Sequence, residues 1–280
     1  MINFNGQLSE KNNFYITPEN RGLSFGDAVF ETMRVSAGKI YFWEDHYFRL
    51  MAAMRIMRME IPMDFTPEFL QNEILKMVED HNKTKTFRVK LLVWRSDGGK
   101  YTPTSSNVSY VITLEKLDSS FYVIDEKPYE IELFKDFFLN SGLLSTLKTN
   151  NKAINVLGSI YAKENGYQNC LLLNEKKQVV DALNGNIFLV NGYKIKTPPL
   201  QDGALNGIIR KQLIAILATM PDYLLDETSV SPFELQKADE IFITNVITGI
   251  QPVTKYRKKE FKSDFAKQVI GKLNAKARLG

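Results

Sequence analysis

Segments that favour strands and segments that favour helices follow one another irregularly along this chain. Residues 87–95 and 107–114 are rich in β-branched and aromatic side chains, and a turn with two glycines lies between them at 96–100, so we predict paired strands. Apolar residues recur at helical spacing in 45–59. This mixture predicts an α+β (mixed α/β) fold.

Other segments support the same fold class. Residues 39–42 are predicted as a short strand, and Thr66 with Pro67 marks the start of a helix that ends near residue 82. Further helices are expected at 152–165, ending at Gly166, at 207–220 and at 263–277; further strands are expected near 129–133, 170–174, 178–181, 186–190 and 238–244. We predict a small N-terminal α/β domain at 1–118, an interdomain link at 119–128 and a larger domain at 129–280.

Composition excludes several classes of protein. The net charge is only +4, and the one dense basic cluster, 255–259, is expected to be a solvated turn, which argues against a nucleic-acid partner. No run reaches membrane-spanning length, and the N-terminal residues do not resemble a signal peptide. Cys170 is the only cysteine, and the two histidines have no metal-ligand spacing. We therefore expect a cytoplasmic protein with no metal and no membrane partner.

A lysine and an aspartate suggest the chemistry. Lys148 lies in Leu147-Lys148-Thr149, and Asp181 follows at the end of a predicted strand. An amine can form a Schiff base with the aldehyde of pyridoxal 5'-phosphate, and a carboxylate can keep the ring nitrogen of that cofactor protonated. One lysine and one aspartate prove little alone, so their surroundings matter.

Two loops could bind the phosphate of such a cofactor. The stretch 203–210 places small residues directly before a predicted helix, and 244–249 leaves a buried strand. Helix N-termini and successive backbone N–H groups bind anions. Arg49 is the candidate for a bidentate phosphate contact, although an arginine on the surface of an amphipathic helix is an equally simple interpretation.

The ordered set of motifs resembles a known family. It begins with Arg21-Gly22-Leu23-Ser24-Phe25-Gly26-Asp27-Ala28-Val29-Phe30-Glu31-Thr32, continues through His46-x-x-Arg49-Leu50, Leu147-Lys148-Thr149 and Asn186-Ile187-Phe188, and ends with Leu205-Asn206-Gly207-Ile208-Ile209-Arg210 and Thr244-Asn245. This order is similar to that of the class IV aminotransferases, the fold type IV pyridoxal phosphate enzymes. The family includes branched-chain and D-amino-acid aminotransferases and 4-amino-4-deoxychorismate lyase.

The resemblance implies roles and an assembly. Lys148 would be the Schiff-base lysine and proton shuttle, Asp181 would face the ring nitrogen, and Arg49 would bind the phosphate. Backbone N–H groups would bind it too, from Ile208, Ile209 and Asn245 or Val246. The family fold has a small N-terminal domain and a larger, β-barrel-like C-terminal domain with helices that binds the cofactor, and it implies a homodimer.

The chain departs from the family pattern at several positions. The family usually has Glu where this chain has Asp181, so the ring must lie closer or a water must bridge. Lys152 falls where branched-chain enzymes have a tyrosine, and it is either a second cation near the ring or a solvent-exposed side chain. Ile209 and Val246 replace threonines whose hydroxyls often assist phosphate binding.

Some motifs favour the lyase over the aminotransferases. Thr32 resembles the lyase pattern and is our second catalytic candidate, and 95–101 is similar to an Arg- and Gly-rich stretch of the lyase. The candidates for contact with a small amino substrate are two aromatic residues and two cations: Phe25, Phe30, Arg88 and Arg95. A branched-chain or D-amino-acid aminotransferase is the alternative, and a non-catalytic family member is a third hypothesis.

Overall fold

The computed structural model describes residues 1–11, 14–82 and 84–279. Its internal contacts divide the chain into two compact units. Unit 1 comprises Met1–Ser120 together with Lys148–Asn151, and unit 2 comprises Phe121–Leu147 and Lys152–Gly280. Both units contain helices and strands, so the predicted α+β class is confirmed. The sequence did not predict that the chain enters unit 1 a second time at 148–151.

Unit 1 is built on a six-stranded antiparallel sheet with the order β2-β1-β6-β5-β3-β4. The predicted pairing of residues 87–95 with 107–114 is confirmed, since β5 and β6 pair in antiparallel register with Val93 opposite Tyr110. The predicted strand at 39–42 ends early, at Ile40. The strands are β1 Ile2–Phe4, β2 Gln7–Ser9, β3 Ala28–Ser36, β4 Lys39–Ile40, β5 Thr86–Arg95 and β6 Val108–Leu117.

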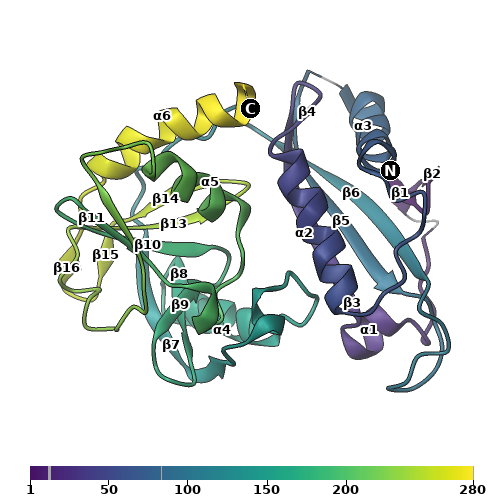
Figure 1. Ribbon diagram of the computed structural model, residues 1–280, viewed down its shortest axis with the longest axis horizontal. Coiled ribbons are helices and arrows are strands. Elements are labelled where there is room, and N and C mark those ends of the chain that lie inside the picture. Colours follow the sequence, from purple (N-terminus) through teal and green to yellow (C-terminus); the bar gives the residue numbers. More distant parts are fainter. Residues whose placement is uncertain (12–13, 83, 280) are drawn as a thin grey trace. The chain divides into compact units, whose positions relative to one another are not determined.

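The helices of unit 1 are α1 Arg21–Phe25, α2 Trp43–Ile56 and α3 Pro67–Asn82. The predicted cap of α3 is present, because the Thr66 hydroxyl accepts a hydrogen bond from the Phe69 N–H at 3.1 Å. Helices α2 and α3 cover one face of the sheet (Figure 1), and Val89 and Leu91 of β5 are completely buried. Because side chains alternate along a strand, Phe30, Thr32 and Lys90 lie on the other face.

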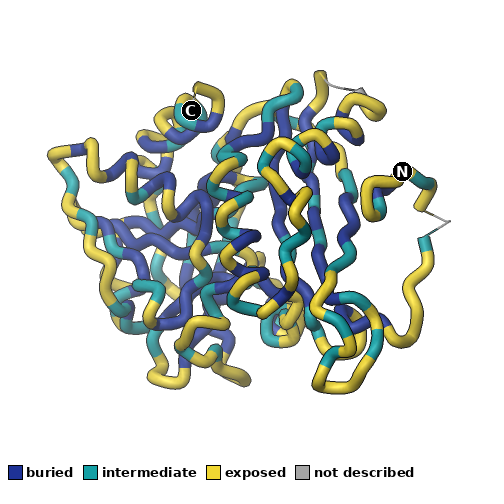
Figure 2. Tube along the Cα trace, turned by 45° about the vertical axis from the view of Figure 1, so that its right-hand side comes forward, coloured by how far each residue is buried: buried dark blue, intermediate teal, exposed yellow. Residues whose placement is uncertain are grey.

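Unit 2 contains two five-stranded sheets with the orders β12-β11-β10-β13-β14 and β16-β15-β7-β8-β9. Strands of both sheets supply one buried core, which includes Leu171 of β8 and Ile243 of β13. Figure 2 shows these strands largely in the dark blue of buried residues. The strands are β7 Glu130–Leu139, β8 Asn169–Asn174, β9 Val179–Ala182, β10 Asn186–Asn191, β11 Lys194–Thr197, β12 Leu224–Glu227, β13 Glu240–Asn245, β14 Gly249–Val253, β15 Lys255–Tyr256 and β16 Lys259–Glu260.

Helices flank the sheets of unit 2. They are α4 Ala153–Glu164, α5 Ile208–Leu217 and α6 Asp264–Leu279, with short 3-10 turns η2 Leu143–Thr146 and η3 Leu200–Asp202. Helix α4 packs on β7 and β8, whereas α5 packs on β13 and α6 on β14. Stacked rings of Phe188, Phe242 and Phe265 attach α6 to its sheet. None of the helices in the described part of the chain is long and apolar enough to cross a membrane.

Candidate functional site

Lys148 lies beside β3 in unit 1. The segment that contains it pairs with the strand in antiparallel fashion: Phe30 donates its N–H to the Lys148 carbonyl at 2.9 Å, and Asn150 donates to the Ala28 carbonyl at 2.9 Å. Lys148 therefore lies opposite Phe30. Its Nζ is 4.5 Å from the centre of the Phe30 ring, which is a cation–π distance.

Two further residues, Lys90 and Thr32, lie on the same face of the sheet as Phe30. The Nζ of Lys90 is 4.9 Å from the centre of the same Phe30 ring, so one aromatic ring contacts two ammonium groups. Thr32 is buried and lies directly opposite Lys90 in the register of β3 and β5. Burial lowers the pKa of Lys90, and the nearby Arg88 lowers it further. The structure thus brings together Phe30, Thr32 and Lys148, three of the predicted site residues.

The opposite face of β3 carries a buried carboxylate that pairs with α2. Arg49 donates its Nε to Oε1 of Glu31 at 2.7 Å and its Nη2 to Oε2 at 2.6 Å, and Nδ1 of His46 is 2.6 Å from Oε2. These contacts fix the guanidinium plane of Arg49 by a bidentate pair. Nε2 of His46 is buried with no hydrogen-bond partner among the described residues.

This pairing has electrostatic consequences. Burial alone would raise the pKa of Glu31, but Arg49 and His46 outweigh it and lower the pKa to about 2. Burial lowers the pKa of His46 despite the neighbouring carboxylate. Glu31 is thus an anion around pH 7. Sequence reasoning missed both residues as site candidates, although they stand inside the quoted motifs.

The other predicted substrate residues of unit 1 have different surroundings. Arg95 is buried and donates to Asp27 at 2.8 Å and to the carbonyls of Met57 and Arg58, which are contacts typical of a structural role. Arg88 pairs with Glu115 at 3.2 Å. Phe25 is 40 % exposed, and the centre of its ring lies 5.8 Å from that of Tyr101. These contacts do not gather the three residues around Lys148.

In unit 2, Asp181 is buried at the end of β9. Its two oxygens accept hydrogen bonds at 2.8 Å each, one from Nδ2 of Asn186 and one from the Leu205 N–H. Burial raises its pKa to about 7, although these two donors, Lys152 and Arg210 partly oppose the shift. A cationic ring nitrogen would favour the ionised carboxylate, because an opposite charge lowers the pKa of an acid.

Asn186 connects Asp181 to the predicted phosphate loops. Its Nδ2 also donates to the Leu205 carbonyl at 2.8 Å, and its Oδ1 lies so close to Gly207 that a Cβ there would be 1.9 Å away. Asn186 also pairs with Thr244 in the register of β10 and β13. The side chain of Asn186 thus contacts the residues before α5, and its strand pairs with the end of β13.

The N-terminus of α5 suits an anion. Helix α5 begins at Ile208, and its N-cap residue, Gly207, has no side chain that could cap the first N–H groups. Ile208 and Ile209 are both buried. Their apolar side chains leave the backbone N–H groups as the donors at this end of the helix.

The turn after β13 has a defined hydrogen-bond pattern. Oδ1 of Asn245 accepts from the N–H groups of Ile247 and Thr248 at 3.0 Å each. No described residue accepts a hydrogen bond from the Val246 N–H. Of the two alternatives for the second phosphate loop, Val246 therefore has the better-placed backbone donor, while Asn245 shapes the turn.

Lys152 precedes α4 and belongs to unit 2. Burial lowers its pKa, and the neighbouring Asp181 partly opposes that shift. Lys152 is half-buried and close enough to Asp181 to interact with it electrostatically, which favours a second cation near the ring over the solvent-exposed side chain that the sequence also allowed. The chemistry of the whole donor set, a lysine, a buried carboxylate and uncapped backbone N–H groups, fits pyridoxal phosphate.

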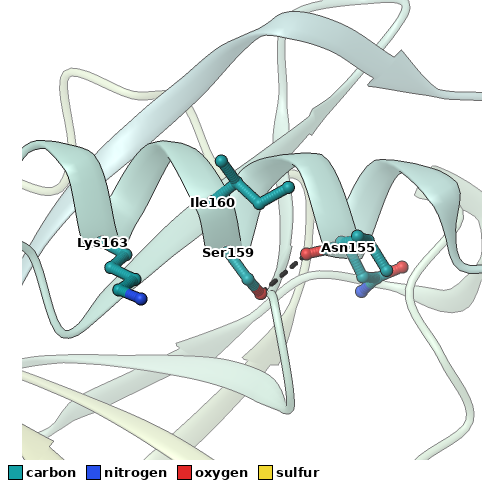
Figure 3. Close-up of a pocket in the computed structure, with 5 residues that line it drawn as sticks. Asn155, Ser159, Ile160 and Lys163 are labelled. Carbon is teal, nitrogen blue, oxygen red and sulfur yellow. Dashed lines mark hydrogen bonds between the residues drawn. The ribbon is translucent and has the colours of Figure 1, made fainter.

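Neither a metal site nor the hollow on α4 involves the predicted site residues. Among the described residues, no three His, Cys, Asp or Glu side chains gather as a metal site would require. A shallow hollow on α4 is lined by Asn155, Val156, Ser159, Ile160 and Lys163, and none of these is a predicted site residue (Figure 3).

Comparison with known proteins agrees with this chemistry. The model of the amino-transferase class IV family matches residues 28–256. A D-alanine aminotransferase from Listeria monocytogenes serotype 4b is 29% identical over 259 residues, which cover 89% of this chain and 85% of the relative. An aminodeoxychorismate lyase from Vibrio harveyi is 23% identical and covers 91% of both chains.

Solved structures share the fold. A branched-chain aminotransferase from Thermoproteus uzoniensis with norvaline superposes with a TM-score of 0.88 at 21% identity, covering 98% of this chain and 92% of that one. The predicted fold type IV architecture is therefore confirmed. The extent of the family match and the full-length relatives lead to one conclusion: this chain belongs to the class IV aminotransferases, a family of pyridoxal phosphate-dependent enzymes.

Proposed function

We propose that this enzyme is an aminodeoxychorismate lyase, which eliminates pyruvate from 4-amino-4-deoxychorismate and leaves 4-aminobenzoate. The observation that carries the proposal is the grouping of Thr32, Lys90 and Lys148 around Phe30 on one face of the sheet of unit 1. The relative from Vibrio harveyi that bears this activity supports it.

The substrate is a dicarboxylate, and the grouping offers it a cation. Lys90 is partly buried, so its ammonium ion is incompletely hydrated and gains from pairing with a carboxylate. Its lowered pKa follows from that burial and would rise again when a carboxylate binds. Arg88 already pairs with Glu115 and Arg95 with Asp27, so we assign to Lys90 the substrate-binding role that the sequence assigned to those two arginines.

Lys148 moves the proton that the reaction requires. Pyridoxal phosphate supplies an electron sink that stabilises the negative charge left when the substrate loses its ring proton. The Lys148 amine accepts that proton from carbon, the bond between the ring carbon and the pyruvate oxygen breaks, and a proton is returned to the departing enol to give pyruvate. The Thr32 hydroxyl, on the same face, is the donor that we assign to the departing oxygen.

Other residues would hold the cofactor. Arg49, oriented by Glu31, and the backbone N–H groups of Ile208, Ile209 and Val246 would bind the phosphate. Asp181 would pair with the ring nitrogen.

An aminotransferase is the second candidate, because the relatives at 28–29% identity are D-alanine aminotransferases. Such an enzyme acts on monocarboxylic amino acids and passes the amino group to a keto acid. The same grouping would serve it, but Lys90 would then pair with the carboxylate of a partner such as 2-oxoglutarate. A non-catalytic protein is the least consistent with the retained Lys148.

Product analysis separates these functions. The cofactor-loaded protein is incubated with aminodeoxychorismate alone and, separately, with D-alanine or branched-chain amino acids plus 2-oxoglutarate. Equal amounts of pyruvate and 4-aminobenzoate without any keto acid are expected. Glutamate formed in the second incubation, with no 4-aminobenzoate in the first, would establish the aminotransferase instead.

A matched pair of variants tests the role of Lys90. Lys90→Gln is expected to lower kcat/KM for aminodeoxychorismate by about tenfold or more, since a charge-assisted contact is lost. Lys85→Gln, at an exposed position just before β5, is the control and should leave kcat/KM unchanged. Equal values for the two variants would remove Lys90 from the substrate site.

A further inference from the structure

Tyr122 is buried where the chain first enters unit 2, and both of its backbone groups are bonded to α6. Its N–H donates to Oδ1 of Asn274 at 2.9 Å, and its carbonyl accepts from Nδ2 of the same side chain at 2.8 Å. Only 3% of Tyr122 is exposed. A side-chain amide that pairs with both backbone groups of one residue holds that residue in a single orientation.

The ring of Tyr122 lies against the hairpin that joins β13 and β14. Gly249, the first residue of β14, has a φ of +74°, and a Cβ at this position would be 2.6 Å from the tyrosine ring. A larger residue would therefore meet both backbone strain and a clash. The hairpin can pack this closely on the Tyr122 ring only because residue 249 is a glycine.

The hydroxyl of Tyr122 reaches the turn itself. It donates a hydrogen bond of 3.1 Å to the carbonyl of Val246. Oδ1 of Asn245 holds the same turn from within through Ile247 and Thr248. The turn is thus fixed from two sides, and the bonds leave the Val246 N–H available to a ligand.

We propose that Tyr122 is a positioning residue for the cofactor phosphate: it fixes the turn so that the Val246 N–H is already oriented towards the anion before the cofactor binds. This inference rests on the cofactor-binding part of the proposed function. A preoriented donor loses little conformational freedom on binding, so removing its support weakens binding of the phosphate group.

Two ligands that differ only in the phosphate test this role. Dissociation constants of pyridoxal 5'-phosphate and of pyridoxal are measured for the cofactor-free protein by absorbance and by fluorescence quenching. Tyr122→Phe removes only the hydroxyl. It is expected to weaken binding of pyridoxal 5'-phosphate about 3- to 10-fold, the range for one hydrogen bond, and to leave pyridoxal unchanged.

A matched control is available in unit 1. The Tyr47 hydroxyl also donates to a backbone carbonyl, that of Phe65, at 2.9 Å. Tyr47→Phe should change neither constant. Asn274→Ala, which removes the bonds to the Tyr122 backbone, should give the same phosphate-dependent loss as Tyr122→Phe.

The outcomes separate this role from the proposed function. If Tyr122→Phe binds pyridoxal 5'-phosphate as tightly as the wild type, or weakens both ligands equally, the positioning role is overturned while the enzyme assignment stands. If the wild-type protein binds neither ligand, the proposed function is overturned and the role of Tyr122 with it.

Discussion

At the scale of single residues, two buried carboxylates have opposite acidities. Glu31 has two cationic or hydrogen-bonding partners on α2, and its pKa falls to about 2. Asp181 is equally enclosed, but its direct partners are an amide and a backbone N–H, and its pKa rises to about 7. The difference shows which carboxylate already has a counter-ion and which one is suited to receive a cationic ligand.

The low pKa of Glu31 predicts a pH-dependent contribution to stability. A depressed pKa means that the folded protein favours the anion, so the contribution is present above about pH 4.5 and is lost as the pH falls through about 2. Glu31→Gln is expected to lower the free energy of unfolding by about 3–5 kcal/mol at pH 7, because it breaks the largely buried ion pair with Arg49.

Denaturant unfolding of the cofactor-free protein at several pH values measures this effect. The difference between the wild type and Glu31→Gln should shrink steadily between pH 4.5 and pH 2. A difference that is constant across this range would mean that the charge of Glu31 does not contribute to stability.

Asp181 is predicted to affect catalysis more than cofactor binding. Asp181→Asn keeps the size of the side chain but removes the negative charge that would hold the ring nitrogen protonated. Turnover should fall about 100-fold or more, while the dissociation constant of pyridoxal phosphate should rise less than about tenfold. Unchanged turnover would show that a group other than Asp181 keeps the ring nitrogen protonated.

At the scale of elements, helices and strands could be predicted from the sequence where neighbouring residues alone determine them, through a cap, a turn or an apolar run. Helix α3 has its cap at Thr66, and the strands β5 and β6 have clear apolar runs with a glycine turn between them, so their positions were predicted to within a few residues. Strand β3 was not predicted. It carries Glu31 and Arg34 at buried positions, and partners distant in sequence neutralise the charge of Glu31.

The start of α5 has the closest packing of the predicted phosphate loops. Gly207→Ala would place a Cβ against Oδ1 of Asn186, so α5 or Asn186 must shift. The free energy of unfolding should fall by about 1–3 kcal/mol, as for other overpacked sites. Cofactor binding should weaken as well, because Asn186 also holds Asp181.

Gly271→Ala on α6 is the control for this variant. A Cβ at Gly271 meets no atom within 4 Å, and alanine favours a helix over glycine by about 1 kcal/mol. Thermal unfolding and cofactor titration of both variants provide the test. If Gly207→Ala and Gly271→Ala have the same stability and the same affinity for the cofactor, the close contact between Gly207 and Asn186 is not needed for cofactor binding.

At the scale of the whole molecule, the residue types of the site could be predicted from the sequence, but their arrangement could not. Lys148 joins unit 1 through a four-residue segment that is flanked by unit 2 on both sides in the chain. Only the backbone pairing with β3 reveals this, and no local pattern encodes it. Lys90 could have been found, because alternation along β5 places it on the face opposite to Val89 and Leu91.

We propose that the exposed face of α4 contributes to the interface of a homodimer. Val156 and Ile160 are 56% and 48% exposed on this helix, and Leu157 is exposed beside them. Apolar side chains that gather on one surface often mark a protein interface. We predict a solution mass twice the 32.1 kDa of one chain.

Light scattering after size exclusion tests this assembly. The double variant Val156→Asp and Ile160→Asp should have the mass of one chain. Met63→Asp, at an exposed apolar residue of unit 1, should not change the mass. A monomeric wild-type protein would contradict the dimer.

The most direct test asks which lysine binds the cofactor. The cofactor-loaded protein is reduced with borohydride and digested, and mass spectrometry locates the phosphopyridoxyl group on a single peptide. We expect the group on Lys148, and we expect Lys148→Ala to abolish both the label and turnover. A label on Lys90 or Lys152 instead, or undiminished activity of Lys148→Ala, would contradict this expectation.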